Sequence, residues 1–158
     1  MPRPLVLVLV FGTILCTGGA KKPVVDIRIH AEGMASEAPS FAFPATLMDG
    51  RQVHLARMPL ISHREVKAIF PFDAADGTRG VYLKLDSHGS GLLNQHTSAV
   101  RGGTLAVFIN GRQVSNLRVS RQVSDGIVSI PRGLTEEDIT VLTSAFPVLG
   151  ASEEKSGR

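Results

Sequence analysis

The sequence predicts an α+β domain: an antiparallel sheet with two helices packed on one face, plus N-terminal strands that include a hairpin. The first supporting observation is Asn110-Gly111, which separates the apolar run 105–109 from an alternating run that ends at Val119. Asn and Gly tolerate positive φ, so the pair predicts a type I′ turn between two strands. Because the run before the turn is apolar on both faces, it belongs in the middle of a covered sheet.

The second observation is the order of periodic segments in the second half of the chain: strand, helix, strand, strand, strand, helix. Residues 80–86 alternate, and Asp86 or Ser87 can cap a helix that runs to about Val100. A short strand, 126–130, is expected to stop at Pro131. The last helix is expected to begin at the capping Thr135 and to end at Pro147. The expected buried faces are Leu92, Leu93, His96 and Val100 in the first helix and Ile139, Leu142 and Phe146 in the second.

The third observation concerns the N-terminal strands. Residues 24–30 alternate, with His30 on the polar face of a half-buried strand. Residues 41–48 and 51–56 flank Asp49-Gly50 and predict a second hairpin, in which Pro44 favours an edge position. Ser62 and Glu65 have the spacing of a capping box, which predicts a single helical turn.

The first twenty residues read as a cleaved export signal. A basic start precedes an apolar core at 5–15, and a small-residue stretch ends at Ala20. The first alternative is a lipoprotein signal with Cys16 as the lipidated residue, and the second is a retained anchor. Cleavage leaves 158 − 20 = 138 residues, enough for one domain. The predicted organisation is therefore a signal peptide at 1–20, N-terminal strands at 21–57, the main α+β region at 58–147 and a disordered tail at 148–158.

Charge and composition argue against a nucleic-acid partner. The formal net charge is +3, the basic residues are scattered, and the chain has no Trp and one Tyr. Little aromatic surface is therefore expected for stacking bases. We expect no membrane span after signal cleavage.

No catalytic or metal-binding motif stands out, and no cofactor is expected. His88 and His96 are eight residues apart on the predicted helix, about 12 Å along its axis, too far to share an ion. A site assembled from His30, His54 or His63 and nearby acids stays open as an alternative. Ser90 lies outside any Gly-x-Ser-x-Gly elbow, and no phosphate-binding glycine motif occurs.

The sheet edges are the remaining candidate surfaces. The edges at 41–48 and 126–130 could accept an extended peptide by strand addition. The equal alternative is that Pro44 and Pro131 discourage such pairing.

Three polar residues around the central hairpin are candidate contacts. Arg112 and Gln113 follow its turn, and Arg101 precedes its first strand. A turn and its flanks project from a sheet, so these side chains could meet a partner; alternatively, they only keep the turn soluble.

Residues 58–147 resemble a known module. The similarity is carried by Pro59-Leu60-Ile61 leading to Val66-Lys67, by 81–86 (VYLKLD) before a glycine-containing helix, by 103–115 (GTLAVFINGRQVS) and by 130–139 (IPRGLTEEDI). In order and spacing these segments are similar to the head subdomain of the first periplasmic domain of SecD, an accessory subunit of the Sec protein-export machinery.

The resemblance implies a non-catalytic module of the cell envelope, most simply in the periplasm, that contacts exported polypeptide or the export machinery. The chain departs from SecD in having no membrane helices after the signal and in carrying its own N-terminal strands. The first alternative is an accessory subunit that docks on one folded envelope partner. The second is a metal-binding protein or enzyme whose site the sequence does not reveal. The oligomeric state is not specified by the sequence.

Overall fold

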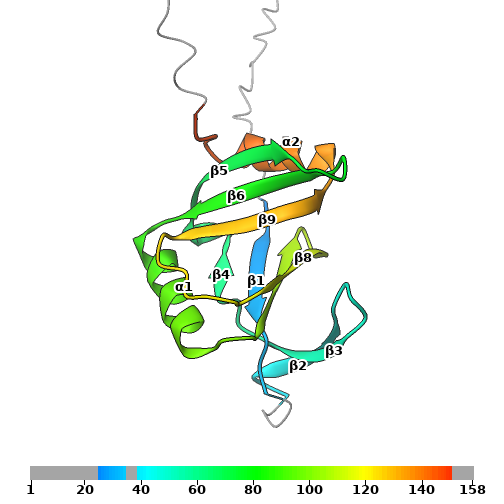
Figure 1. Ribbon diagram of the computed structural model, residues 1–158, viewed down its shortest axis with the longest axis vertical. Helices are drawn as coiled ribbons and strands as arrows, with labels where there is room; N and C mark the ends of the chain where they lie inside the picture. Colours follow the sequence, from blue (N-terminus) through cyan, green and yellow to red (C-terminus); the bar gives the residue numbers. More distant parts are fainter. Residues whose placement is uncertain (1–24, 35–38, 151–158) are drawn as a thin grey trace, which may run out of the picture.

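A computed structural model describes residues 25–34 and 39–150 of the chain (Figure 1). Nine strands and two α-helices are formed by these residues, with one short 3₁₀ turn, η1. In chain order they are β1 (Ile27–Ala31), β2 (Ala42–Thr46), β3 (Gln52–Ala56), β4 (Ile61–Ser62), η1 (His63–Glu65), β5 (Val66–Asp73), β6 (Arg79–Leu85), α1 (Ser87–Ala99), β7 (Thr104–Ile109), β8 (Arg112–Arg118), β9 (Ile127–Leu134) and α2 (Glu136–Ala145). None of the helices described is long and apolar enough to cross a membrane.

A four-stranded antiparallel sheet, in the order β4-β1-β7-β8, forms the middle of the molecule. The predicted hairpin is confirmed as β7 and β8, with Asn110 at φ 49° and Gly111 at φ 79° in the turn. β7 lies between β1 and β8, and five of its six residues are buried. Its continuous apolar run is therefore explained by cover on both faces.

A three-stranded antiparallel sheet, in the order β5-β6-β9, crosses the top of the molecule in Figure 1. The expectation that the last strand stops at Pro131 is wrong, because β9 continues to Leu134. Proline is tolerated there since β9 is an edge strand and its register with β6 shifts between Ile130 and Leu134. The missing N–H therefore breaks no regular pairing.

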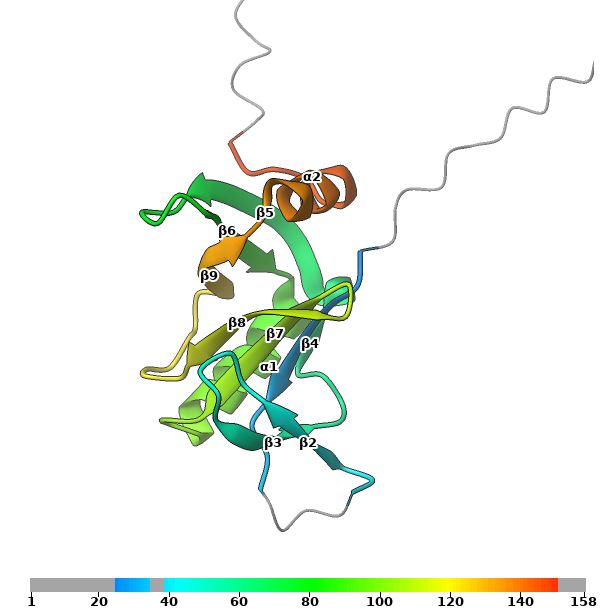
Figure 2. The same cartoon turned by 90° about the vertical axis from the view of Figure 1, so that its right-hand side faces the viewer.

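The β2–β3 hairpin forms a separate two-stranded sheet (Figure 2). It packs on the face of the four-stranded sheet that is turned away from the main core. Leu47, Val53 and Leu55 of the hairpin region form a small apolar cluster with Ala106 of β7. This packing also covers His30, which is only 7% exposed. The expectation of a polar outer face at His30 is therefore wrong.

The α+β class is confirmed, but the predicted single sheet is replaced by three. α1 contacts β4 and β6, whereas α2 contacts β5. In α1, Leu93 is buried as expected, but the other buried residues are Gly89 and Thr97, and Val100 is 39% exposed. Asp86 and Thr135 cap the two helices as predicted, and Ser62 and Glu65 form the predicted capping box.

The chain after α2 runs along the outer edge of β5. The N–H of Ile69 donates to Pro147 O at 2.9 Å, and the N–H of Leu149 donates to Ile69 O at 2.8 Å. Ile69 and Val148 thereby form a parallel bridge. The expectation of a disordered tail from residue 148 therefore does not hold for 148–149, because Pro147 and Leu149 hydrogen-bond to Ile69 on either side of Val148. Residues 151–158, the signal region 1–20 and Cys16 lie outside the described part of the chain.

Candidate functional site

A cleft of about 440 Å³ opens between β8 and β9, where the two larger sheets face each other. The two strands approach at one end, where Gly133 lies against the Val114 carbonyl, but they are not paired. At the other end they are joined by a linker, residues 119–126. The cleft is therefore bordered by two strand edges and a connecting loop.

The first wall is the free edge of β9. The N–H of Leu85 donates to Gly126 O at 2.9 Å, and β9 keeps this register through Val128 and Ile130. Backbone direction alternates along an antiparallel strand, so Ile127 and Ser129 turn their N–H and C=O groups away from β6. The Ile127 N–H donates to the Asp125 carboxylate at 3.0 Å. Ser129 therefore presents one N–H donor and one C=O acceptor to the cleft.

The second wall is the free edge of β8. The N–H of Val119 donates to Gly103 O at 2.9 Å, which fixes the alternation in this part of the β7–β8 ladder. Leu117 therefore faces β7 with its backbone groups, whereas Asn116 and Arg118 direct theirs outward. Both outward-facing residues line the cleft.

The floor of the cleft is mostly apolar, with Thr97 as its one polar side chain. Leu93 and Thr97 of α1, Leu105 of β7 and Val128 of β9 line it, and all four are at most 4% exposed. These side chains belong to or border the main core, so the base of the cleft is fixed by packing. An apolar side chain that enters the cleft would therefore be buried against a preformed surface.

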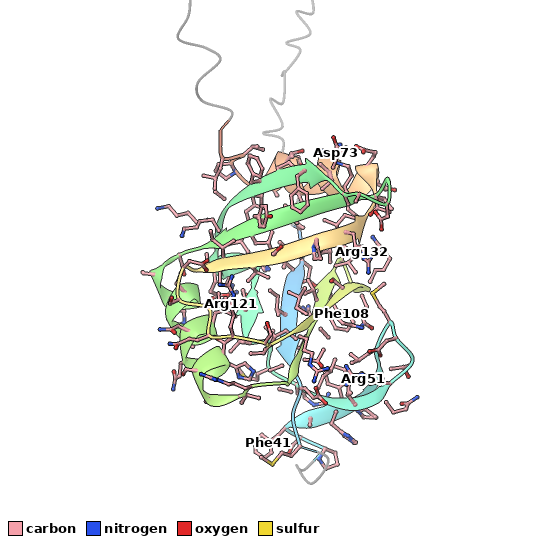
Figure 3. All side chains as sticks on the ribbon, viewed as in Figure 1. Phe41, Arg51, Asp73, Phe108, Arg121 and Arg132 are labelled. Carbon is pink, nitrogen blue, oxygen red and sulfur yellow. The ribbon has the colours of Figure 1, made fainter. Side chains whose placement is uncertain are left out.

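The linker is held in place by hydrogen bonds to its surroundings. The Val123 N–H donates to Thr97 Oγ1 at 2.9 Å, and Lys84 Nζ donates to Asp125 O at 2.7 Å. Exposed Arg121 lies on the linker, whereas Arg132 lies near the opposite end of β9 (Figure 3). The charged residues that line the cleft are Arg118, Arg121 and Asp125.

A second, smaller hollow of about 350 Å³ lies beside the β2–β3 hairpin. It is lined by Asp26, Arg28, His30, Phe43, Arg57, Phe108 and Gly111. His30 packs edge-on against the rings of Phe43 and Phe108, and its Nδ1 lies 2.8 Å from Ala56 O. Arg28 is paired with Asp26 at 3.0 Å. These contacts explain the buried histidine as part of the packing under the hairpin.

The histidines do not assemble a metal site within the described residues. No group of three His, Cys, Asp or Glu side chains there is placed to hold an ion. His63 Nδ1 lies 4.0 Å from Asp26 Oδ1, and His30 Nδ1 lies within hydrogen-bond distance of Ala56 O. The geometry among 25–34 and 39–150 therefore gives no support to the alternative site built from His30, His54 and His63.

The predicted contact residues are not brought together. Arg112 pairs with Asp138 at the start of α2, and the Gln113 amide donates to Asn116 Oδ1. Arg101 lies near Thr104, which pairs with Arg118 at the opposite end of the hairpin. None of the three lines the cleft.

One wall of the cleft is predictable from the sequence, and the rest is not. The segment 126–130 was identified as an edge, and it forms most of the β9 wall. The edge of β8 and the α1 floor have no sequence signal of their own, because their placement depends on how two sheets meet. A run of Ser, Gln and Arg at 120–122 between two strands was the available hint of an exposed linker.

Comparison with known proteins identifies the fold. No family model matches the chain, and no curated protein matches its sequence. Among solved structures, the chain matches one of SecDF, described as a membrane component that enhances protein export, with a TM-score of 0.54, 13% identity and 79% of this chain covered. It also matches SecDF in a super-membrane-facing form, with a TM-score of 0.55, 13% identity and the same coverage.

The resemblance to the SecD head is thus confirmed at the level of fold. The chain spans 64% of the first matched structure and 19% of the second. The matched part of this chain, 79% of 158 residues or about 125, is larger than the 90 residues of segment 58–147. The likeness therefore includes part of the chain outside the segment in which the sequence resemblance was found.

Proposed function

We propose that the chain is a non-catalytic module of the cell envelope, exported to the periplasm, that binds extended polypeptide in the cleft between β8 and β9. The observation that carries this proposal is the pair of free strand edges facing an apolar floor. Backbone groups on such edges recognise another extended backbone, which gives affinity without a fixed sequence. The fold shared with SecDF supports a role related to protein export.

The three-stranded sheet already accepts an added segment at its other edge. Residues 147–149 lie along β5 and make two backbone hydrogen bonds to Ile69. This intramolecular contact is a strand addition with one residue at its centre. An extended client at β9 would repeat the same chemistry, with Ser129 in the role that Ile69 has in β5.

The Ser129→Pro variant tests this function directly. Proline removes the N–H that faces the cleft, but it leaves the β6–β9 ladder intact because that N–H is not used for pairing with β6. The probe is a reduced, carboxymethylated model protein carrying a fluorophore, whose binding is followed by anisotropy. We expect the variant to bind at least tenfold more weakly than the wild-type chain.

A matched control places proline on another free edge. The N–H of Leu47 donates to Arg51 O, so by alternation the N–H of Thr46 points away from β3. Thr46→Pro therefore makes the same chemical change outside the cleft and should bind like wild type. Circular dichroism checks that both variants are folded. Equal binding by Ser129→Pro and wild type, or an equal loss in both variants, would overturn the proposal.

Crosslinking in cells separates this function from docking on one folded partner. A photoreactive residue at Ile127, 37% exposed at the edge of the cleft, should yield adducts with many exported polypeptides. A single stoichiometric adduct with one folded envelope protein would instead support an accessory-subunit role.

A further inference from the structure

The outward face of the three-stranded sheet carries a group of aromatic side chains. Phe70 is 44% exposed and Tyr82 is 41% exposed, and Phe72 lies beside them. The centroid of the Tyr82 ring lies 4.8 Å from that of Phe72 and 6.3 Å from that of Phe70, and the ring planes are inclined by 30° in each pair. A Cβ added at Gly80 would clash with the Phe72 ring, so this ring covers the glycine. The aromatic face is therefore continuous across β5 and β6.

This aromatic face reaches the edge at which a client would bind. Tyr82 pairs with Ser129 of β9. Two larger residues lie two positions away from Ser129 on either side, Ile127 before it and Pro131 after it. Alternation places Ile127, Ser129 and Pro131 on the same outward face as Tyr82. These three β9 residues also line the cleft. The small Ser129 side chain thus leaves a gap between two larger neighbours, directly in front of Tyr82.

We propose that the cleft selects extended segments that carry an aromatic or large apolar side chain opposite Ser129, where that side chain folds over Ser129 onto the Tyr82 ring. This inference rests on the proposed binding of extended polypeptide at β9. An added strand would lie two strand spacings, about 9.6 Å, from the Tyr82 backbone, within reach of two facing aromatic side chains. The alternate residues of the client would enter the apolar cleft.

The exposed backbone groups of β9 indicate that the occupant is a polypeptide. Ser129 presents an N–H and a C=O at the boundary between the cleft and the aromatic face. These groups match the spacing of an extended peptide, and the aromatic face beside them provides apolar contact for every second side chain. The client class is therefore an unfolded segment with apolar residues on both faces, typical of the interior strands of folded proteins.

Two synthetic peptides test the selectivity. Both alternate Val with a second residue and carry terminal lysines for solubility; the second residue is Phe in one peptide and Ser in the other. We expect the full-length chain to bind the Phe peptide about tenfold more tightly. In Tyr82→Ser this preference should fall below threefold, while affinity for the Ser peptide stays unchanged.

Phe70→Ser is the matched control. Phe70 lies on the same face with nearly the same exposure as Tyr82, but it is three strand spacings, about 14 Å, from the added strand. This variant should keep the tenfold preference. An equal loss in both variants would indicate docking of a partner on the whole aromatic face and would overturn the inference. Equal binding of the two peptides by wild type overturns the selectivity alone, whereas no binding of either overturns the proposed function as well.

Discussion

The two outer edges of the three-stranded sheet differ in whether another segment of the chain hydrogen-bonds to them. At β5, the residues after α2 return along the edge and hydrogen-bond to both backbone groups of Ile69. At β9, the linker before the strand satisfies one outward-facing group, the Ile127 N–H, through the Asp125 carboxylate. The outward-facing N–H and C=O of Ser129 have no hydrogen-bond partner among the described residues. One edge is thus covered by the chain's own segment, and the other faces a cleft.

This difference indicates that the fold leaves the β9 edge accessible while it covers the β5 edge. Exposed strand edges invite unwanted pairing, and proteins commonly cover them or interrupt them with proline. β5 is covered, and β9 carries Pro131 beyond the accessible Ser129. The accessible stretch is therefore short, which limits what can bind there to one segment at a time.

The largest expected effect comes from loosening the helix that precedes the covering segment. Leu142 of α2 is fully buried in the main core. Leu142→Ala should lower the free energy of unfolding by about 2–5 kcal/mol, because it removes buried methyl groups and leaves a cavity. Urea denaturation measures the change. A loss below about 1 kcal/mol would contradict the packing of α2 against β5.

Proline substitutions at the two edges compare them directly. Leu149→Pro removes the N–H that donates to Ile69 O and should lower the free energy of unfolding by about 1–2 kcal/mol. Ser129→Pro should change it by less than about 0.5 kcal/mol, since no partner in the described part of the fold uses that N–H. Thermal or urea unfolding of both variants provides the comparison. Equal losses would show that the β9 edge is engaged within the chain.

A smaller loss than that of Leu142→Ala is expected at the corner where the two larger sheets meet, around Asp138. Burial acts to raise the pKa of Asp138, but hydrogen bonds from Arg112 and Thr135 outweigh burial and hold this pKa below its usual value. A lowered folded-state pKa stabilises the protein above the unfolded value of about 4, and this stability is lost as pH falls through the folded pKa.

Asp138→Asn should therefore be less stable than wild type by about 1 kcal/mol at pH 7. The difference should shrink progressively below about pH 4. Urea unfolding at several pH values measures it. A difference that stays constant down to pH 2 would show that ionised Asp138 does not stabilise this corner.

Local sequence signals predicted the elements better than their assembly. Asn110-Gly111 and the Ser62–Glu65 box were correct because turns and caps depend on residues a few positions apart. The single-sheet prediction failed because an alternating strand has the same pattern whichever sheet it joins. β1 pairs with β7, so that Ile29 lies opposite Val107, and no local pattern reports a partner so distant in the chain.

The candidate site was predictable only in part for the same reason. The sequence predicts residues 126–130 as a short strand at a sheet edge, but Leu93 and Leu105 form the floor only after α1 and β7 have packed together. Arg101, Arg112 and Gln113 are predicted contacts because a turn and its flanks project from a sheet. Such projection predicts exposed polar groups, whereas the cleft is formed by backbone edges, which have no side-chain signature.

Hydrogen exchange of two backbone amides, observed by NMR, tests the central claim most directly. The Ile69 amide should be protected, because it donates to Pro147 O, whereas the Ser129 amide should exchange rapidly in the free protein. Addition of the unfolded, carboxymethylated model protein should protect Ser129 and leave Ile69 unchanged. A Ser129 amide that is already protected in the free protein, or that stays unprotected when the model protein is bound, would contradict polypeptide binding at the β9 edge.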